Sequence, residues 1–207
     1  MRRVQGPGPY DAVVIGGSAG SLKVLYELLP QLPGDLPWPL VVVVHLHPQQ
    51  EGGFADLLDR RCSLRIKEAE DKELLAPGQV YFAPANYHLL IEPGQTLSLS
   101  ADERVKYSRP SIDVLFESAA EAFRSRLIGI ILTGASDDGA KGLSKIKEQR
   151  GLTVVQDPAT AEHPFMPQAV LEALAPDHVL SPMGIVALLV SLAEHEPGCP
   201  GPQTLNE

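Results

Sequence analysis

Short apolar runs alternate with helical patterns along most of the chain. Runs of apolar, largely β-branched residues predict strands at 12–15, 39–45, 64–69, 127–132, 152–156 and 178–180. Apolar residues at helical spacing predict helices that follow residue 20 and at 54–61, 111–123, 140–150, 165–174 and 184–193. Strands that alternate with helices are typical of a parallel sheet covered on both faces. The pattern therefore predicts a doubly wound α/β fold.

One segment breaks this alternation. Short strands are predicted at 80–84, 88–92 and 96–100, separated by Ala-Asn and Pro-Gly-Gln turns. Three short strands joined by tight turns predict a small antiparallel β-meander, inserted into the mostly parallel fold. No internal repeat accompanies it. We therefore expect one catalytic domain at 10–195, preceded by a linker at 1–9 and followed by a flexible tail at 196–207.

Composition and charge narrow the class of protein. The 207 residues carry a formal net charge of −9, and no Lys/Arg-rich block interrupts the chain, which disfavours nucleic acid and anionic membranes as partners. Cys62 and Cys199 lie far apart, which predicts neither a disulfide framework nor a cysteine metal motif. The longest apolar run, at 40–44, is too short to span a bilayer, and no signal peptide is apparent. We expect a cytoplasmic protein.

The first predicted strand leads into a glycine-rich turn at 16–21, Gly-Gly-Ser-Ala-Gly-Ser, and then into a helix. Such a turn can bind a phosphate at the helix N-terminus, or it can present a serine nucleophile beside backbone N–H groups. The turn matches G-x-S-x-G and does not match the dinucleotide pattern G-x-G-x-x-G. Small residues also occur in such turns for packing alone, so the turn by itself leaves all three interpretations open.

Two further strand ends carry reactive side chains. His45 ends the second strand, and Asp137 and Asp138 follow the strand at 127–132. Because ligands gather at the carboxyl ends of parallel strands, a hydroxyl nucleophile (Ser18), a base and an orienting carboxylate are expected to meet there. The order Ser–His–Asp differs from the Ser–Asp–His order of α/β-hydrolases. Each residue also has a structural interpretation: a turn serine, a structural histidine, and aspartates that cap the following helix.

The remaining histidines do not indicate a metal site. His47 lies two positions after His45, but no cysteine or acidic partner is evident nearby, so we expect neither a metal nor a cofactor. His88, His163 and His178 are expected in loops or at the surface.

Motifs in the same order along residues 11 to about 190 give the chain a family resemblance. They are Ile-Gly-Gly-Ser-Ala-Gly-Ser at 15–21, Val-His-Leu-His-Pro at 44–48, Glu-Ala-Glu-Asp at 68–71, Pro-Gly-Gln-Val-Tyr-Phe-Ala-Pro at 77–84, Ser-Arg-Pro-Ser-Ile-Asp-Val-Leu-Phe at 108–116, Gly-Ile-Ile-Leu-Thr-Gly-Ala-Ser-Asp-Asp-Gly-Ala-Lys-Gly at 129–142, Val-Gln-Asp-Pro-Ala-Thr-Ala at 155–161 and Met-Pro-Gln-Ala at 166–169. With these motifs the sequence resembles the catalytic domain of the CheB family, the chemotaxis protein-glutamate methylesterases.

The resemblance implies an activity and assigns roles. Ser18 would be the nucleophile, His45 the base and Asp138 the acid of a triad that hydrolyses glutamate γ-methyl esters on chemoreceptor helices through an acyl-enzyme. The family also deamidates receptor glutamines. Methylated chemoreceptor-like proteins would be the substrate. Family members usually carry a phospho-receiver, whereas about ten residues precede the first strand here, so a separate response regulator is an expected partner.

The chain also departs from the family pattern, and other hypotheses stay open. Ala19 replaces a common threonine, and Asp137 replaces a common asparagine, which places a second negative charge where it could raise the pKa of Asp138. A basic group could contact an acidic receptor helix or form an ordinary solvated face; it comprises Arg60, Arg61, Arg65 and Lys67. A non-catalytic receptor-docking module and a nucleotide- or phosphate-binding domain are the alternative functions.

Overall fold

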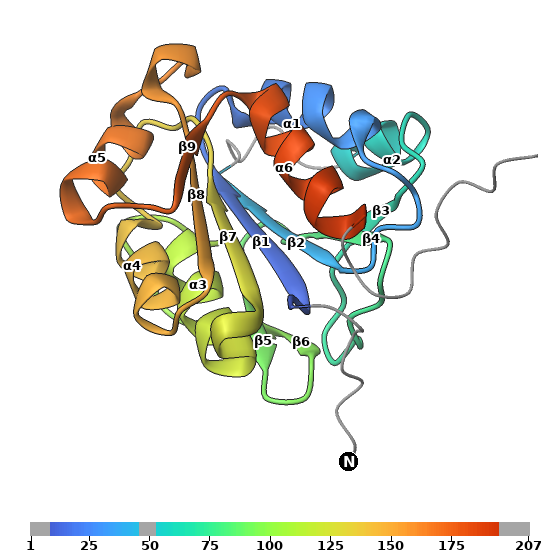
Figure 1. The fold of residues 1–207 in the computed structure, drawn as a ribbon. Coiled ribbons are helices and arrows are strands. Elements are labelled where there is room, and N and C mark those ends of the chain that lie inside the picture. The colour runs from blue at the N-terminus through green and yellow to red at the C-terminus, as the bar shows by residue number, and fades with distance from the viewer. Residues whose placement is uncertain (1–8, 46–52, 195–207) are drawn as a thin grey trace, which may run out of the picture.

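The computed structural model describes residues 9–45 and 53–194, and within them a parallel sheet forms the centre of the molecule (Figure 1). Its seven strands lie in the order β3-β4-β2-β1-β7-β8-β9, and every neighbouring pair is parallel. The strands are β1 (Ala12–Gly17), β2 (Leu40–Val44), β3 (Arg65–Glu68), β4 (Gln79–Phe82), β7 (Leu127–Ile131), β8 (Leu152–Gln156) and β9 (His178–Leu180). The predicted fold class is confirmed.

Helices cover both faces of this sheet (Figure 1). The helices are α1 (Ser21–Leu28), α2 (Phe54–Asp59), α3 (Ile112–Phe123), α4 (Ala140–Glu148), α5 (Phe165–Ala173) and α6 (Pro182–Glu194), with 3₁₀ turns at Leu29–Gln31, Arg124–Arg126 and Pro158–Thr160. Val13 and Ile15 of β1 pack into the core under α1, α2 and α6, whereas Ala12 and Val14 pack into the core under α3, α4 and α5. Because strand side chains alternate between faces, a strand that is buried on both faces must be apolar throughout.

The predicted β-meander is wrong in one strand. Only β5 (His88–Glu92) and β6 (Thr96–Ser100) form an antiparallel pair, while β4 lies in the main sheet, parallel to both β2 and β3. The physical reason is burial on both faces. Val80 and Phe82 join one core and Tyr81 joins the other, which suits an inner strand of a parallel sheet. In β6, by contrast, only Leu97 is buried, as expected of a half-exposed hairpin.

Several sequence-based expectations concern segments that the structure leaves undescribed. The linker at 1–9, apart from Pro9, and the tail at 196–207 lie outside the described residues, as do His47 and Cys199. Among the described residues, Cys62 is a free thiol. No helix within 9–45 and 53–194 combines the length and hydropathy that a bilayer crossing requires.

The order of the strands determines where a site can form. The chain passes from β1 outward to β2 on one side, while β7, β8 and β9 extend the sheet on the other side. Ligands of open α/β sheets bind at such a point, beyond the carboxyl ends of the strands that flank the reversal. The residues that directly follow β1, β2 and β7 therefore lie at the same edge of the sheet.

Candidate active site

Backbone hydrogen bonds connect the three strand ends that carry the predicted triad. Ser18 N donates to Thr133 O after β7 at 3.0 Å, and His45 N donates to Gly17 O at 3.1 Å. The serine turn is thus bonded to the strand ends on both of its sides. The predicted convergence of Ser18, His45 and the aspartate loop at one edge of the sheet is confirmed at the level of the backbone.

Close packing around Ser18 requires glycine at neighbouring positions. Gly20 has φ +80°, which favours glycine, and it forms the N-cap of α1. A Cβ atom added to Gly134 would lie 2.9 Å from Ser18 Cβ, so the loop after β7 could not approach the serine with a larger residue at this position. The carbonyl oxygen of Ser18 accepts hydrogen bonds from Ser21 N at 3.0 Å and from Ser21 Oγ at 2.5 Å. These contacts hold the serine at the entrance of a helix.

His45 and Asp138 form the central pair of the site. His45 Nε2 lies 2.8 Å from Asp138 Oδ2, and the histidine side chain is 14% exposed while the aspartate is buried. An ionised carboxylate only accepts hydrogen bonds, so Nε2 carries the hydrogen and Nδ1 is the ring nitrogen with a free lone pair. Among the described residues, no hydrogen bond joins the Ser18 hydroxyl to this ring in the resting structure. Catalytic hydrogen bonds of that kind often tighten only when substrate binds.

The N-terminus of α3 holds the Asp138 carboxylate. Ser111 Oγ donates to Oδ1 at 3.0 Å, Asp113 N donates to Oδ1 at 3.1 Å, and Ile112 N donates to Oδ2 at 2.7 Å. Burial alone would raise the pKa of Asp138, but the hydrogen bonds from His45 and from these backbone N–H groups hold it below the ordinary value. The positive end of the α3 dipole acts in the same direction. Asp138 is therefore ionised at neutral pH.

Two structural interpretations of the aspartates are thereby overturned. Neither Asp137 nor Asp138 caps α4, because Gly139 occupies the N-cap position and makes no side-chain hydrogen bond. The pKa of Asp138 is lowered overall and Asp137 is not among the main causes of the shift, so the raised pKa expected from a second negative charge is not found. The Asp137 carboxylate instead pairs with Lys106, its Oδ2 3.3 Å from Nζ.

A second buried carboxylate lies beside the pair. Asp113 Oδ1 accepts hydrogen bonds from Gly139 N at 2.9 Å and Gly142 N at 2.8 Å, while Lys106 Nζ lies 3.1 Å from Oδ2. Burial raises the pKa of Asp113, as does the charge of Asp138, against the opposing effects of the Gly142 N–H and the Lys106 ammonium. Asp113 thus fixes the loop that carries Asp138, and sequence reasoning assigned it no such role.

Comparisons with known proteins agree with this geometry. The family model described as CheB methylesterase matches residues 13–189. The chain belongs to the CheB methylesterase family. It is therefore a carboxylic ester hydrolase by family.

Individual relatives support the assignment. A putative protein-glutamate methylesterase/protein-glutamine glutaminase of Leptospira interrogans is 50% identical over 186 residues, which cover 90% of this chain and 96% of the relative. The protein-glutamate methylesterase FrzG of Myxococcus xanthus is 41% identical, with 84% of this chain and 52% of FrzG covered. The crystal structure of the Thermotoga maritima CheB methylesterase catalytic domain superposes with a TM-score of 0.84 at 36% identity, covering 88% of this chain and 98% of that one.

One histidine of this CheB-family protein was misjudged from sequence. His88 is buried, and its Nδ1 accepts a hydrogen bond from Ser111 N at 3.1 Å, so its Nε2 donates to Glu103 O at 3.0 Å. It therefore supports the turn that holds Asp138. His163 lies in a loop, as expected, with its side chain 44% exposed. No cluster of three potential metal ligands occurs within 9–45 and 53–194.

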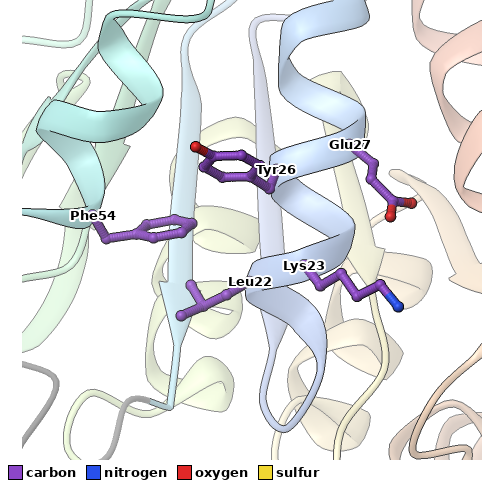
Figure 2. Close-up of a pocket in the computed structure, with 5 residues that line it drawn as sticks. All are labelled: Leu22, Lys23, Tyr26, Glu27 and Phe54. Carbon is purple, nitrogen blue, oxygen red and sulfur yellow. The ribbon is translucent and has the colours of Figure 1, made fainter.

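A pocket of about 240 Å³ lies between α1 and α2, and its lining comprises Leu22, Lys23, Tyr26, Glu27 and Phe54 (Figure 2). Leu22 follows Ser18 by four positions, but none of the three triad candidates lines the pocket. Two of the four residues of the basic group are paired within the molecule: Arg61 stacks on Tyr26 at 4.4 Å, and Lys67 Nζ contacts Glu70 at 2.6 Å and Glu73 at 3.0 Å. These contacts favour an ordinary solvated face for the basic group.

Proposed function

We propose that this CheB-family protein hydrolyses glutamate γ-methyl esters on chemoreceptor-like proteins, with Ser18 as nucleophile, His45 as general base and Asp138 as the acid that orients the base. The observation that carries the proposal is the 2.8 Å pair between His45 Nε2 and the buried Asp138 carboxylate, one strand away from the Ser18 turn. The relatives named protein-glutamate methylesterases support a methyl ester of a protein glutamate as the substrate.

In the first half-reaction, Ser18 Oγ attacks the ester carbonyl carbon while His45 Nδ1 takes the hydroxyl proton. The tetrahedral intermediate collapses, the C–O bond to the methoxy group breaks, and His45 returns the proton so that methanol leaves. Water then attacks the Ser18 ester, again with His45 as base, and the glutamate carboxylate and free Ser18 are formed. A receptor glutamine would follow the same route with ammonia as leaving group, which accords with the glutaminase activity in the relative's name.

Charge develops at two places in these steps. The imidazolium of His45 forms directly against the ionised Asp138, whose lowered pKa keeps it charged. Oxyanion stabilisation falls to backbone N–H groups at the start of α1, because Ala19 supplies no side-chain donor. Ala19 N makes no hydrogen bond to another described residue, so it is the candidate donor, at the position after the nucleophile.

The alternative functions explain less of this arrangement. A docking module has no use for a desolvated carboxylate held against an imidazole, an arrangement that is costly to bury. A phosphate-binding turn would have no use for the carboxylate side of the site, since a second anion there opposes phosphate binding.

We further propose that the protein acts in the cytoplasm and is controlled by a separate response regulator. The cytoplasmic location is suggested by the chemoreceptor segments that the family modifies. Control by a response regulator is suggested by the receiver domain that usually controls family members. Addition of the phosphorylated and unphosphorylated regulator to the esterase assay tests the second point, and equal rates would refute it.

Methanol release from membranes that carry methylated chemoreceptors tests the central proposal. We expect Ser18→Ala to reduce turnover by roughly 10⁴-fold or more. The matched control is Ser63→Ala, an exposed serine outside the site, which should retain wild-type turnover. Release that persists unchanged in Ser18→Ala would refute the mechanism, and no release by the wild-type protein would refute the substrate.

A further inference from the structure

Two large exposed side chains belong to segments that lie next to the loop between β7 and α4. Tyr107 is 96% exposed and Phe165 is 56% exposed. Neither ring is needed for the core. Both lie on segments that hydrogen bonds fasten to the active-site loops.

Tyr107 lies at the tip of a tight turn next to the acid. Val105 and Ser108 exchange two backbone hydrogen bonds, at 3.1 and 2.8 Å, and the central residues Lys106 and Tyr107 have φ +46° and +65°. Two-residue hairpin turns of this conformation favour Asn-Gly, because both central residues must adopt positive φ. The chain instead places lysine and tyrosine there. Strained backbone of this kind concentrates at functional sites.

Contacts with the acid loop fix this turn. Lys106 Nζ donates to the carbonyl oxygen of Asp137 at 2.9 Å, one residue before Asp138. Behind the turn, Arg109 Nη1 donates to Ala101 O at 2.7 Å and to Asp102 O at 2.9 Å. The base of the loop is thus immobilised, while the tyrosine ring remains in solvent beside the carboxylate end of the triad.

Phe165 occupies the corresponding position at the nucleophile end. Gly134 N donates to His163 O at 3.0 Å, and Met166 N donates to Gly134 O at 2.9 Å. Gly134 is the residue whose added Cβ would lie 2.9 Å from Ser18 Cβ. Residues 163–166 therefore run beside the serine, and Phe165 opens α5 with its side chain more than half exposed.

We propose that Tyr107 and Phe165 bind the polypeptide on either side of the methylated glutamate of a chemoreceptor segment. This rests on the proposed function and adds the residues that recognise the protein part of the substrate. Aromatic side chains supply large contact area at low cost in side-chain entropy, which is why they dominate protein interfaces. A polypeptide extends beyond its ester in both directions, whereas a small ester lacks these flanking residues.

The test compares two substrates. Tyr107→Ala and Phe165→Ala are assayed on membranes with methylated chemoreceptors and on N-acetylglutamate γ-methyl ester. We expect each substitution to lower the ratio of the two kcat/KM values, receptor over small ester, by at least about fivefold. Tyr107→Phe should restore most of the ratio, because it retains the ring.

Leu74→Ala is the matched control, since Leu74 is an exposed apolar residue, at 67%, far from the triad. Leu74 bridges to Thr96 at the turn end of the β5–β6 hairpin, whereas the opposite end, at His88, contacts Ser111. Its ratio should stay at the wild-type value. An equal loss on both substrates, or no loss on either, would overturn the proposal.

A binding measurement separates this inference from the proposed chemistry. A methylated chemoreceptor cytoplasmic fragment is titrated against Ser18→Ala protein with and without Tyr107→Ala or Phe165→Ala. If the wild-type protein hydrolyses no receptor ester, the proposed function fails, yet a Kd weakened at least about fivefold by either aromatic substitution would still support binding by Tyr107 and Phe165. An unchanged Kd, or no binding by Ser18→Ala protein, would refute it.

Discussion

Replacing Lys106 with methionine removes the cation that faces the second buried carboxylate. Lys106 Nζ lies 3.1 Å from Asp113 Oδ2, and the lysine side chain is 32% exposed while Asp113 is buried. Burial alone would lower the pKa of Lys106, but the carboxylates of Asp113 and Asp137 raise it, so the ammonium is fully charged in the folded protein. Methionine retains the apolar stem and removes only the charge.

The expected loss of stability depends on how far the side chains of Lys106 and Asp113 are exposed to solvent. Two charges 3.1 Å apart attract by about 5 kcal/mol at an effective dielectric constant of roughly 20. Loss of one partner from a fully buried pair costs about 3–5 kcal/mol, whereas exposed pairs are worth roughly 0–1 kcal/mol. Because Asp113 is buried and Lys106 is one-third exposed, we expect a loss of about 2 kcal/mol in the free energy of unfolding at neutral pH.

The pH dependence is the sharper part of this prediction. The pKa of Asp113 is already raised by burial and by Asp138, and removal of the ammonium raises it further. A group with a raised folded-state pKa contributes stability at low pH that is lost as the pH rises through that pKa. The difference between Lys106→Met and wild type should therefore be small below about pH 4 and grow toward neutral pH.

Urea unfolding of both proteins at pH 4 and pH 7 measures this difference. Lys141→Met is the control, because Lys141 pairs with Glu117 at 2.9 Å on the surface and should change stability little at either pH. A Lys106→Met penalty that is equal at both pH values would refute the electrostatic reasoning, as would a penalty no larger than that of the control.

Two further substitutions test Asp138, the proposed acid, and the side chain of Ser111 that donates to it. Asp138→Asn retains the shape but not the charge, so we expect ester turnover to fall about 10⁴-fold while the protein stays folded, and activity near wild type would contradict the role of Asp138. Because the pKa of Asp138 is lowered in the folded protein, its contribution to the free energy of unfolding is present above about pH 4 and is lost as the pH falls through the lowered value. The stabilities of wild type and Asp138→Asn should therefore converge in unfolding measurements at low pH. Ser111→Ala removes both the cap of α3 and a donor to Asp138. We expect this substitution to lower the free energy of unfolding, measured in denaturant, by about 2–3 kcal/mol. A loss below about 0.5 kcal/mol would contradict this prediction and show that water replaces the hydroxyl.

Much of the fold could be predicted because burial on two faces leaves a plain pattern. The runs at 12–15 and 39–45 are apolar without alternation, as a central parallel strand must be, and they form β1 and β2. The same rule explains the error at β4. The spacing of this segment along the chain favours grouping it with the short strands that follow, whereas its consecutive apolar residues Val80, Tyr81 and Phe82 indicate burial on both faces.

The candidate residues of the site could be predicted from the sequence only where a reactive side chain marks them. Ser18, His45 and Asp138 stand at strand ends, where reactive residues are expected, and the sheet order brings those ends together. The supports of Asp138 were missed because two of them are backbone N–H groups of Ile112 and Asp113, which exist at every non-proline residue and leave no mark on composition. His88 was missed for a related reason, since its partners are the backbone atoms of Ser111 and Glu103.

The surroundings of Asp138, the proposed acid, are therefore built by two segments that are distant in sequence. The loop after β7 supplies the Asp138 carboxylate, and the N-terminus of α3 supplies three donors that keep it charged. Asp113 closes the arrangement in the other direction, because it belongs to α3 and accepts hydrogen bonds from Gly139 and Gly142 at the start of α4. Each helix start thus binds a carboxylate that belongs to the other segment. A shift of either helix would break both sets of hydrogen bonds, so the packing of α3 against α4 determines the position of the acid and, through His45, that of the proposed base.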